Sequence, residues 1–241
     1  MAFGSKAEII LLAPTPGEYL GLTSHLKQKT FNHLKVTIVE TGPGKINAAL
    51  KLSLELTARD LDGKRPAFVA GVGTCGSLDK TLVRGNVVSS KDCIICDWRH
   101  EDGKEILVGP YGVFDYGEAT EKRVKSMAIT SDSKLIGELI EELGKNAFKV
   151  GRVLTADSFV SGAKLKLSLG KIFSALVCDM ESGAFAYTSK RFNELPWFNL
   201  RVVADTLDES LADYFKMEKT VTDILGERTV EALGFLDRLL E

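Results

Sequence analysis

Short apolar runs alternate with amphipathic segments along this chain. Residues 8–13 form an apolar run of the length of a buried strand, and residues 34–40 alternate between apolar and polar positions, as a strand does. Between them, residues 17–29 place Tyr19, Leu22 and Leu26 on one helical face. Strand and helix patterns continue to alternate toward the C-terminus, which predicts an α/β fold.

The remaining elements follow from the same patterns. Further strands are predicted at residues 67–72, 86–89, 93–98, 149–154, 176–180 and 199–204. Helices are predicted after the turn at residues 41–44, with Ile46, Ala49, Leu50 and Leu54 as the buried face, at residues 133–145, and from about residue 220 onward. Because ligands of such sheets bind beyond the carboxyl ends of the strands, the residues that follow each strand are candidates for a site.

The composition narrows the class of protein. The chain has 241 residues, of which 44% are hydrophobic and 27% charged, as in a soluble globular protein. We find no repeat or linker and expect one domain over residues 1–241. The net charge of −2 supplies no broad basic field, so we expect no nucleic acid and no membrane as a partner.

The same counts bear on the compartment. No apolar run reaches the roughly 18 residues of a membrane span, and the N-terminal apolar stretch is shorter than the roughly 7–15 residues that a secretory signal needs. Four cysteines are too few for a disulfide scaffold in a chain of this length. We therefore expect a reduced, cytoplasmic protein.

Two motifs resemble cofactor or metal sites, but the residues around them do not fit such sites. Gly71-Val-Gly-Thr-Cys-Gly76 fits G-x-G-x-x-G, but a strand rather than a helix follows it, so we expect a tight glycine turn and no dinucleotide site. Cys93 and Cys96 lie three residues apart within a strand, which turns them to opposite faces. With no second cysteine or histidine pair, we expect no metal and no cofactor.

Three carboxylates occupy the positions where a site is expected. Glu18 opens the first helix, Glu181 follows the strand that ends near Met180, and Asp205 ends the last strand. Each one alone is most simply a helix-capping residue. We expect all three to lie on one rim of the sheet, beside the glycines of residues 42–44 and 71–76, and together they indicate a site.

Six segments, in this order, resemble the nucleoside phosphorylase and nucleosidase superfamily, most closely its 5'-methylthioadenosine/S-adenosylhomocysteine nucleosidases. They are residues 41–49 (TGPGKINAA), 73–78 (GTCGSL), 84–89 (RGNVVS), 156–160 (ADSFV), 179–184 (DMESGA) and 201–205 (RVVAD). The resemblance covers about residues 8–240. It implies a three-layer α/β/α sandwich around a mixed, partly barrel-like sheet, a homodimer, a small nucleoside as substrate and no metal.

The resemblance also implies roles for single residues. Asp205 corresponds to the acid that protonates N7 of the purine, and Glu18 to the carboxylate that positions or deprotonates the attacking water. Glu181 corresponds to the residue that binds the ribose hydroxyls. Around them, Met180 would lie under the sugar, Phe159 would stack on the base, the backbone of Val160 would bind the base edge, and Thr74 would place a hydroxyl near the water.

The chemistry of the bond supports these roles independently. Breaking an N-glycosidic bond leaves negative charge on the purine and positive charge on the ribose. A buried carboxylic acid such as Asp205 can neutralise the base, and carboxylates such as Glu18 and Glu181 favour the cationic sugar. The sequence therefore predicts a purine nucleosidase.

Three alternatives stay open at this point. A phosphorylase of the same fold needs arginines for phosphate, and the first loop (residues 15–18) and residues 69–73 contain none. A futalosine-type hydrolase is suggested because prolines at residues 14–17 and at Pro43 replace the family's residues where the 5' substituent should lie. A nucleoside-binding protein without catalysis would not require all three carboxylates.

Overall fold

The computed structural model describes residues 6–99, 105–108, 114–117, 120–209 and 211–241. Its described strands form one sheet: β1 (Ala7–Ala13), β2 (Leu34–Glu40), β3 (Phe68–Ser77), β4 (Val87–Ser90), β5 (Asp92–Arg99), β6 (Glu105–Val108), β7 (Phe114–Gly117), β8 (Ile129–Thr130), β9 (Lys149–Val150), β10 (Arg152–Thr155), β11 (Ala175–Asp179) and β12 (Trp197–Asp205). The helices are α1 (Pro16–Leu26), α2 (Lys45–Leu61), α3 (Glu121–Met127), α4 (Lys134–Lys145), α5 (Ala163–Phe173), α6 (Ser182–Arg191) and α7 (Leu211–Leu239).

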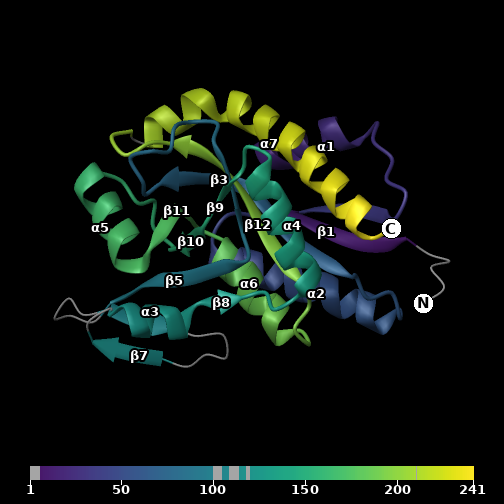
Figure 1. Ribbon diagram of the computed structural model, residues 1–241, viewed down its shortest axis with the longest axis horizontal. Coiled ribbons are helices and arrows are strands. Elements are labelled where there is room, and N and C mark those ends of the chain that lie inside the picture. The colour runs from purple at the N-terminus through teal and green to yellow at the C-terminus, as the bar shows by residue number, and fades with distance from the viewer. Residues whose placement is uncertain (1–5, 100–104, 109–113, 118–119, 210) are drawn as a thin grey trace.

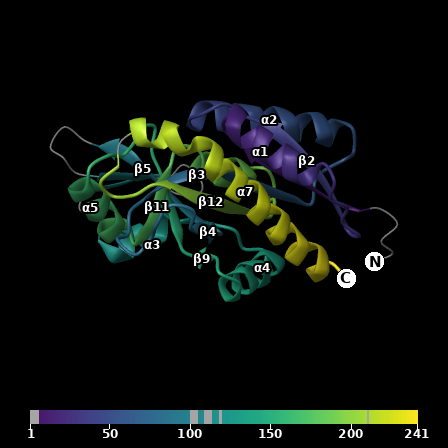
Figure 2. The ribbon, with the colours of Figure 1, turned by 90° about the horizontal axis from the view of Figure 1, so that it is seen from above.

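Helices cover both faces of this sheet (Figures 1 and 2). Side chains of β1 alternate between the two sides, with Ile9 and Leu11 in the cluster beneath α1, α4 and α7, and Ile10 and Leu12 in the cluster beneath α2 and α6. A third cluster joins α3 and α5 to β5, β10 and β11. The predicted three-layer α/β/α architecture with a mixed sheet is confirmed.

Strand β3 is the centre of the sheet and changes its neighbour along one edge. Residues 68–71 pair with β1 in parallel, whereas Gly76 and Ser77 pair with β11 in the antiparallel direction. Strand β12 pairs with the opposite edge of β3 over almost its whole length. Residues 72–75 of β3 therefore lie where β1 has ended and β11 has not begun, and this gap is where a ligand can approach the backbone.

The prediction of which face of α2 is buried is wrong. Ile46, Leu50 and Leu54 are 79%, 57% and 58% exposed, and the buried positions of the helix are Ala48, Leu52 and Leu56. Of the predicted face, Ala49 alone packs against the core, and only partly. Two apolar stripes run along α2, displaced by two residues and thus by about 200° around the helix. Periodicity detects both stripes but does not show which one meets the sheet.

The ends of other elements also differ from the predictions. The last helix begins at Leu211, well before residue 220, and the predicted strand at 149–154 is divided into β9 and β10. The predicted strand at residues 34–40 is confirmed as β2, and the helix predicted at residues 133–145 is confirmed as α4, with Ser133 as its N-cap. Although α7 has 29 residues, no helix among the described residues is long and apolar enough to cross a membrane.

Candidate active site

A pocket of about 290 Å³ opens at the gap in the pairing of β3. All seven residues predicted from the sequence line it: Glu18, Thr74, Phe159, Val160, Met180, Glu181 and Asp205. Pro14, Pro43 and Phe215 lie on the same lining. A larger hollow of about 550 Å³ near the C-terminal end of α1 has four lysines and no carboxylate in its lining, so it does not offer this chemistry.

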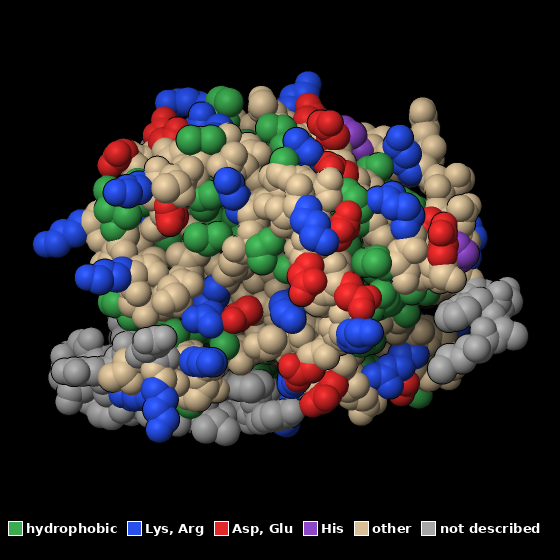
Figure 3. Space-filling view, viewed as in Figure 1, with side chains coloured by type: hydrophobic (Ala, Val, Ile, Leu, Met, Phe, Trp, Pro, Cys, Tyr) green, Lys and Arg blue, Asp and Glu red, His purple; other side chains and the backbone are tan. Residues whose placement is uncertain are grey.

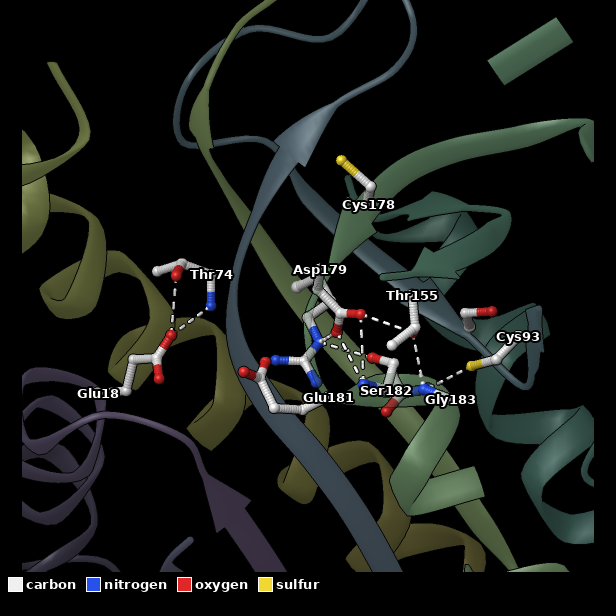
Figure 4. A network of polar contacts seen from close by, with 12 residues as sticks. Glu18, Thr74, Cys93, Thr155, Cys178, Asp179, Glu181, Ser182 and Gly183 are labelled. Atoms are coloured by element: carbon white, nitrogen blue, oxygen red, sulfur yellow. Dashed lines mark hydrogen bonds and ion pairs between the residues drawn. The ribbon is translucent and has the colours of Figure 1, made fainter. Parts of the chain in front are cut away.

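Glu18 enters the pocket because of how α1 begins. Thr15 is the N-cap of α1 and Glu18 is the N3 residue of a capping box, in which the Thr15 N–H donates to Glu18 Oε2 at 2.9 Å. The other oxygen, Oε1, accepts from the Thr74 N–H at 2.6 Å and from the Thr74 hydroxyl at 2.8 Å (Figure 4). This Thr74 N–H is available because β3 has no neighbouring strand there. The capping box of α1 thus holds the Glu18 carboxylate against the unpaired edge of β3 at Thr74.

The pKa of Glu18 is subject to opposing influences. Burial raises it above its ordinary value, whereas the Thr74 donors, the charge of Arg201 and the Thr15 N–H lower it. The pKa remains raised overall. A carboxylate with a raised pKa is a stronger base when it is ionised, which suits a group that takes a proton from water.

Glu181 lies across from Glu18, at the N-cap position of α6. Its Oε1 accepts from the Gly44 N–H at 2.8 Å, and Gly44 has the positive φ of 87° that a glycine adopts without strain. Burial, followed by the charge of Asp179, raises the pKa of Glu181 to about 8. The glycine turn at residues 42–44 predicted from the sequence therefore holds the carboxylate predicted to bind ribose.

A buried arginine lies behind these carboxylates. The Nε of Arg201 is 2.8 Å from Asp179 Oδ2 and donates to the Ser182 hydroxyl at 2.8 Å. Asp179 also accepts from the Thr155 hydroxyl and from the Ser182 N–H (Figure 4). The two terminal nitrogens of Arg201 are buried and have no hydrogen-bond partner in the described part of the chain. Sequence reasoning assigned no role to Arg201 or Asp179, because a motif does not show which charges are paired.

Asp205 ends β12 and lines the pocket. It is 2% exposed, and burial raises its pKa, against the opposing influence of Lys166. A raised pKa means that the carboxyl keeps its proton to a higher pH, which is the state a general acid requires. Phe159, Val160 and Ser158, from the loop that follows β10, line the pocket with it.

The glycines of residues 71–76 do not form the tight turn that we predicted from the sequence. They belong to the continuous strand β3, where Gly71, Gly73 and Gly76 are paired with Asn199, Arg201 and Asp205 of β12. A Cβ at Gly73 would lie 3.0 Å from Glu18 Oε1 and would overlap Arg201, and one at Gly76 would lie 2.8 Å from Asp205 Oδ2. These glycines leave space for the polar side chains of the neighbouring strand.

The two remaining motif predictions concern metals and cysteines. Cys93 and Cys96 point into different hydrophobic clusters on opposite sides of β5, as their spacing predicts. Among the described residues, no group of three or more His, Cys, Asp or Glu side chains could hold a metal ion. Basic and acidic side chains are interspersed over the face seen in Figure 3.

Comparison with known proteins places these features in a family context. The sequence profile of the Phosphorylase superfamily matches residues 9–241. A 5'-methylthioadenosine/S-adenosylhomocysteine nucleosidase of Staphylococcus aureus is 26% identical over 200 residues, which are 83% of this chain and 81% of that protein.

Solved structures show the same fold at lower identity. The S-adenosylhomocysteine nucleosidase of Streptococcus pyogenes, in complex with 5-methylthiotubericidin, superposes with a TM-score of 0.74 at 18% identity, covering 98% of each chain. The futalosine hydrolase of Helicobacter pylori superposes with a TM-score of 0.69 at 17% identity, covering 94% of this chain and 97% of that one.

Proposed function

Because the chain belongs to the Phosphorylase superfamily, we propose that it is a nucleosidase that hydrolyses the N-glycosidic bond of a purine nucleoside. The observation that carries this proposal is the pocket itself, into which Glu18, Glu181 and Asp205 converge from three different elements. We infer that the substrate is 5'-methylthioadenosine or S-adenosylhomocysteine, the compounds named for the Staphylococcus aureus relative, and that adenine is released.

In the reaction that we propose, the bond between C1' of the ribose and N9 of the purine breaks and its electron pair stays on the base. Asp205 gives its proton to N7, which neutralises the departing purine. Water attacks C1' and loses a proton to Glu18, with the Thr74 hydroxyl beside it. The proton that Asp205 donates neutralises the base, and the proton that water loses is accepted by Glu18.

The remaining lining residues hold the substrate in this proposal. Glu181 accepts hydrogen bonds from the ribose hydroxyls, with Met180 under the sugar. Phe159 stacks on the base, and the backbone of Val160 binds the base edge. The unpartnered nitrogens of Arg201 lie close to Glu18 and give it a nearby positive charge without entering the pocket lining.

Water rather than phosphate is the acceptor that the pocket favours. The described residues that line it include four carboxylates and no lysine or arginine. Arg201 is adjacent, but its Nε is already paired with Asp179. A phosphate dianion would therefore meet carboxyl groups and no cation in this lining, because the bidentate arginines that usually bind it do not line the pocket.

We expect base release in phosphate-free buffer at the same rate as in phosphate. The purified chain is incubated with 5'-methylthioadenosine, adenosine, inosine and futalosine, and the base and the sugar product are identified. A preparation of Asp205→Asn made in parallel serves as the control for contaminating phosphorylase. Ribose 1-phosphate products, or activity only after phosphate is added, would identify a phosphorylase. Activity on futalosine alone would favour the alternative hydrolase.

We propose that the active form is a homodimer joined through α2. Ile46, Leu50 and Leu54 form an exposed apolar stripe with one helical turn between neighbours, which is the surface pattern of an interaction site. Leu50→Glu would place a charge at the centre of this stripe. We expect this variant to be monomeric in analytical ultracentrifugation, whereas Leu20→Glu on α1, which is also exposed, should leave the assembly unchanged. A wild-type chain that sediments as a monomer would refute the proposal.

A further inference from the structure

Lys166 is a fully buried lysine whose charge is directed at the proposed acid. It lies on α5, has 0% exposure, and places Nζ 2.5 Å from Asp205 Oδ2 and 2.6 Å from the carbonyl oxygen of Thr206. Lysine is rarely buried without a paired carboxylate, because removing an ammonium from water is costly. Lys166 is absent from the pocket lining, so its ammonium contacts Asp205 and not a substrate.

Other charged and titratable groups near Asp205 act from a greater distance. Glu209 raises the pKa of Asp205 and Arg84 lowers it, but these two side chains form an ion pair with each other. Arg84 Nε also donates to the carbonyl oxygen of Ala204 at 3.0 Å. From β3 and β11, Cys75 and Cys178 face the carboxylate, and burial raises the pKa of both thiols well above its usual range, so both are neutral. Lys166 is therefore the cation in direct contact with Asp205.

The contact with Lys166 makes the two oxygens of Asp205 unequal as sites for the proton. A lysine ammonium only donates hydrogen bonds, so the oxygen that it contacts must accept. Oδ2 accepts from Lys166, whereas Oδ1 makes no hydrogen bond within the described residues. The carbonyl oxygen of a protonated carboxyl is a better acceptor than its hydroxyl oxygen, so the contact with Lys166 favours the proton on Oδ1. Asp205 lines the pocket, so this oxygen is the one available to a base.

We propose that Lys166 is a positioning residue that keeps the acidic proton of Asp205 on Oδ1 and stabilises the carboxylate left after that proton has passed to N7 of the purine. This inference rests on the nucleosidase function proposed above. In the step, the proton moves from Oδ1 to N7, the C1'–N9 electron pair stays on the base, and Lys166 keeps all its protons. A proton from solvent restores Asp205 after the base has left.

The test is Lys166→Met, which keeps the length of the side chain and removes its charge. Asp205 can remain protonated in this variant, so no unpaired charge is buried and folding should persist. Lys164→Met is the matched control, since Lys164 is an exposed lysine on the same helix. Lys166→Gln, which can donate a hydrogen bond without a charge, provides a second variant.

With a purine nucleoside, we expect kcat of Lys166→Met to fall about 10²-fold, the size of effect seen when one preorganised electrostatic contact is removed. The purine carries the charge that Asp205 must neutralise, whereas 4-nitrophenyl riboside has a leaving group that departs without protonation. For the riboside we therefore expect little change. The fall in kcat at alkaline pH should also shift to higher pH, because the ammonium lowers the pKa of Asp205 and its removal leaves burial unopposed.

Equal losses for both substrates, or an unchanged alkaline limb, would overturn the role of Lys166. This failure is distinct from that of the proposed function. If the wild-type chain cleaves purine nucleosides and Asp205→Asn selectively impairs that cleavage, the nucleosidase proposal stands even when Lys166→Met behaves like its control.

Discussion

Asp205→Asn should lower kcat for a purine nucleoside by about 10²–10⁴-fold, which corresponds to about 3–5 kcal/mol of activation free energy. Asparagine has the shape of the aspartic acid, and its oxygen can still accept from Lys166, but it has no carboxyl proton to deliver to N7. KM should change little, because the loss concerns the transition state. Steady-state kinetics on 5'-methylthioadenosine measures both constants.

Two controls separate the acid role of Asp205 from a structural one. Cleavage of 4-nitrophenyl riboside needs no protonated leaving group and should be nearly unaffected, and the circular dichroism melt should match that of the wild type. In the wild type, kcat for the purine substrate should fall as pH rises through the raised pKa of Asp205. A loss of equal size on both substrates would remove the acid role from Asp205.

Glu18→Gln should lower kcat by about 10²–10⁴-fold while the nucleoside still binds, because an amide cannot take a proton from water. Glutamine also serves at the N3 position of a capping box, so the start of α1 should be preserved. Single-turnover kinetics gives the rate of the chemical step, and equilibrium binding of the substrate gives Kd. The expected outcome is a slow chemical step with Kd close to the wild-type value.

The matched control for Glu18 is its hydrogen-bond partner in the helix cap. Thr15→Ser keeps the capping hydroxyl that binds the Glu18 N–H and should retain near-normal kcat. If Glu18→Gln turned over at the wild-type rate, another group would have to activate the water, and the carboxylate of Glu18 would be a structural cap only.

The site residues that could be predicted from the sequence are those that lie at or just after the ends of strands. Glu18 follows β1 and Asp205 ends β12, and both strands run parallel to β3, so their carboxyl ends lie at one rim. Glu181 follows β11, which is antiparallel to β3 but pairs with it only at Gly76 and Ser77, near the carboxyl end of β3. The resemblance added Thr74, Phe159, Val160 and Met180, and all of them line the same pocket. Local position and family motif therefore located the lining without any coordinates.

The features that the sequence did not reveal depend on contacts between distant segments. Helix α5, which carries Lys166, was not predicted, because apolar and polar residues alternate at residues 163–169 as they do in a strand. Its pairing with Asp205 joins residues 39 positions apart. In α2, two apolar stripes compete for the core, and only packing against β1 and β3 selects the one that contains Leu52.

The pairing of β3 glycines with β12 side chains has a consequence for how the chain folds. Strand register is fixed wherever a slip would bring incompatible side chains together. Moving β12 by two residues toward the carboxyl end of β3 would set Arg201 opposite Cys75 instead of Gly73, and the cysteine side chain would occupy the space of the guanidinium. Each of the polar side chains Asn199, Arg201 and Asp205 therefore lies opposite a glycine, which leaves room for it. The same residues that form the pocket therefore also favour the native register of β3 and β12 during folding.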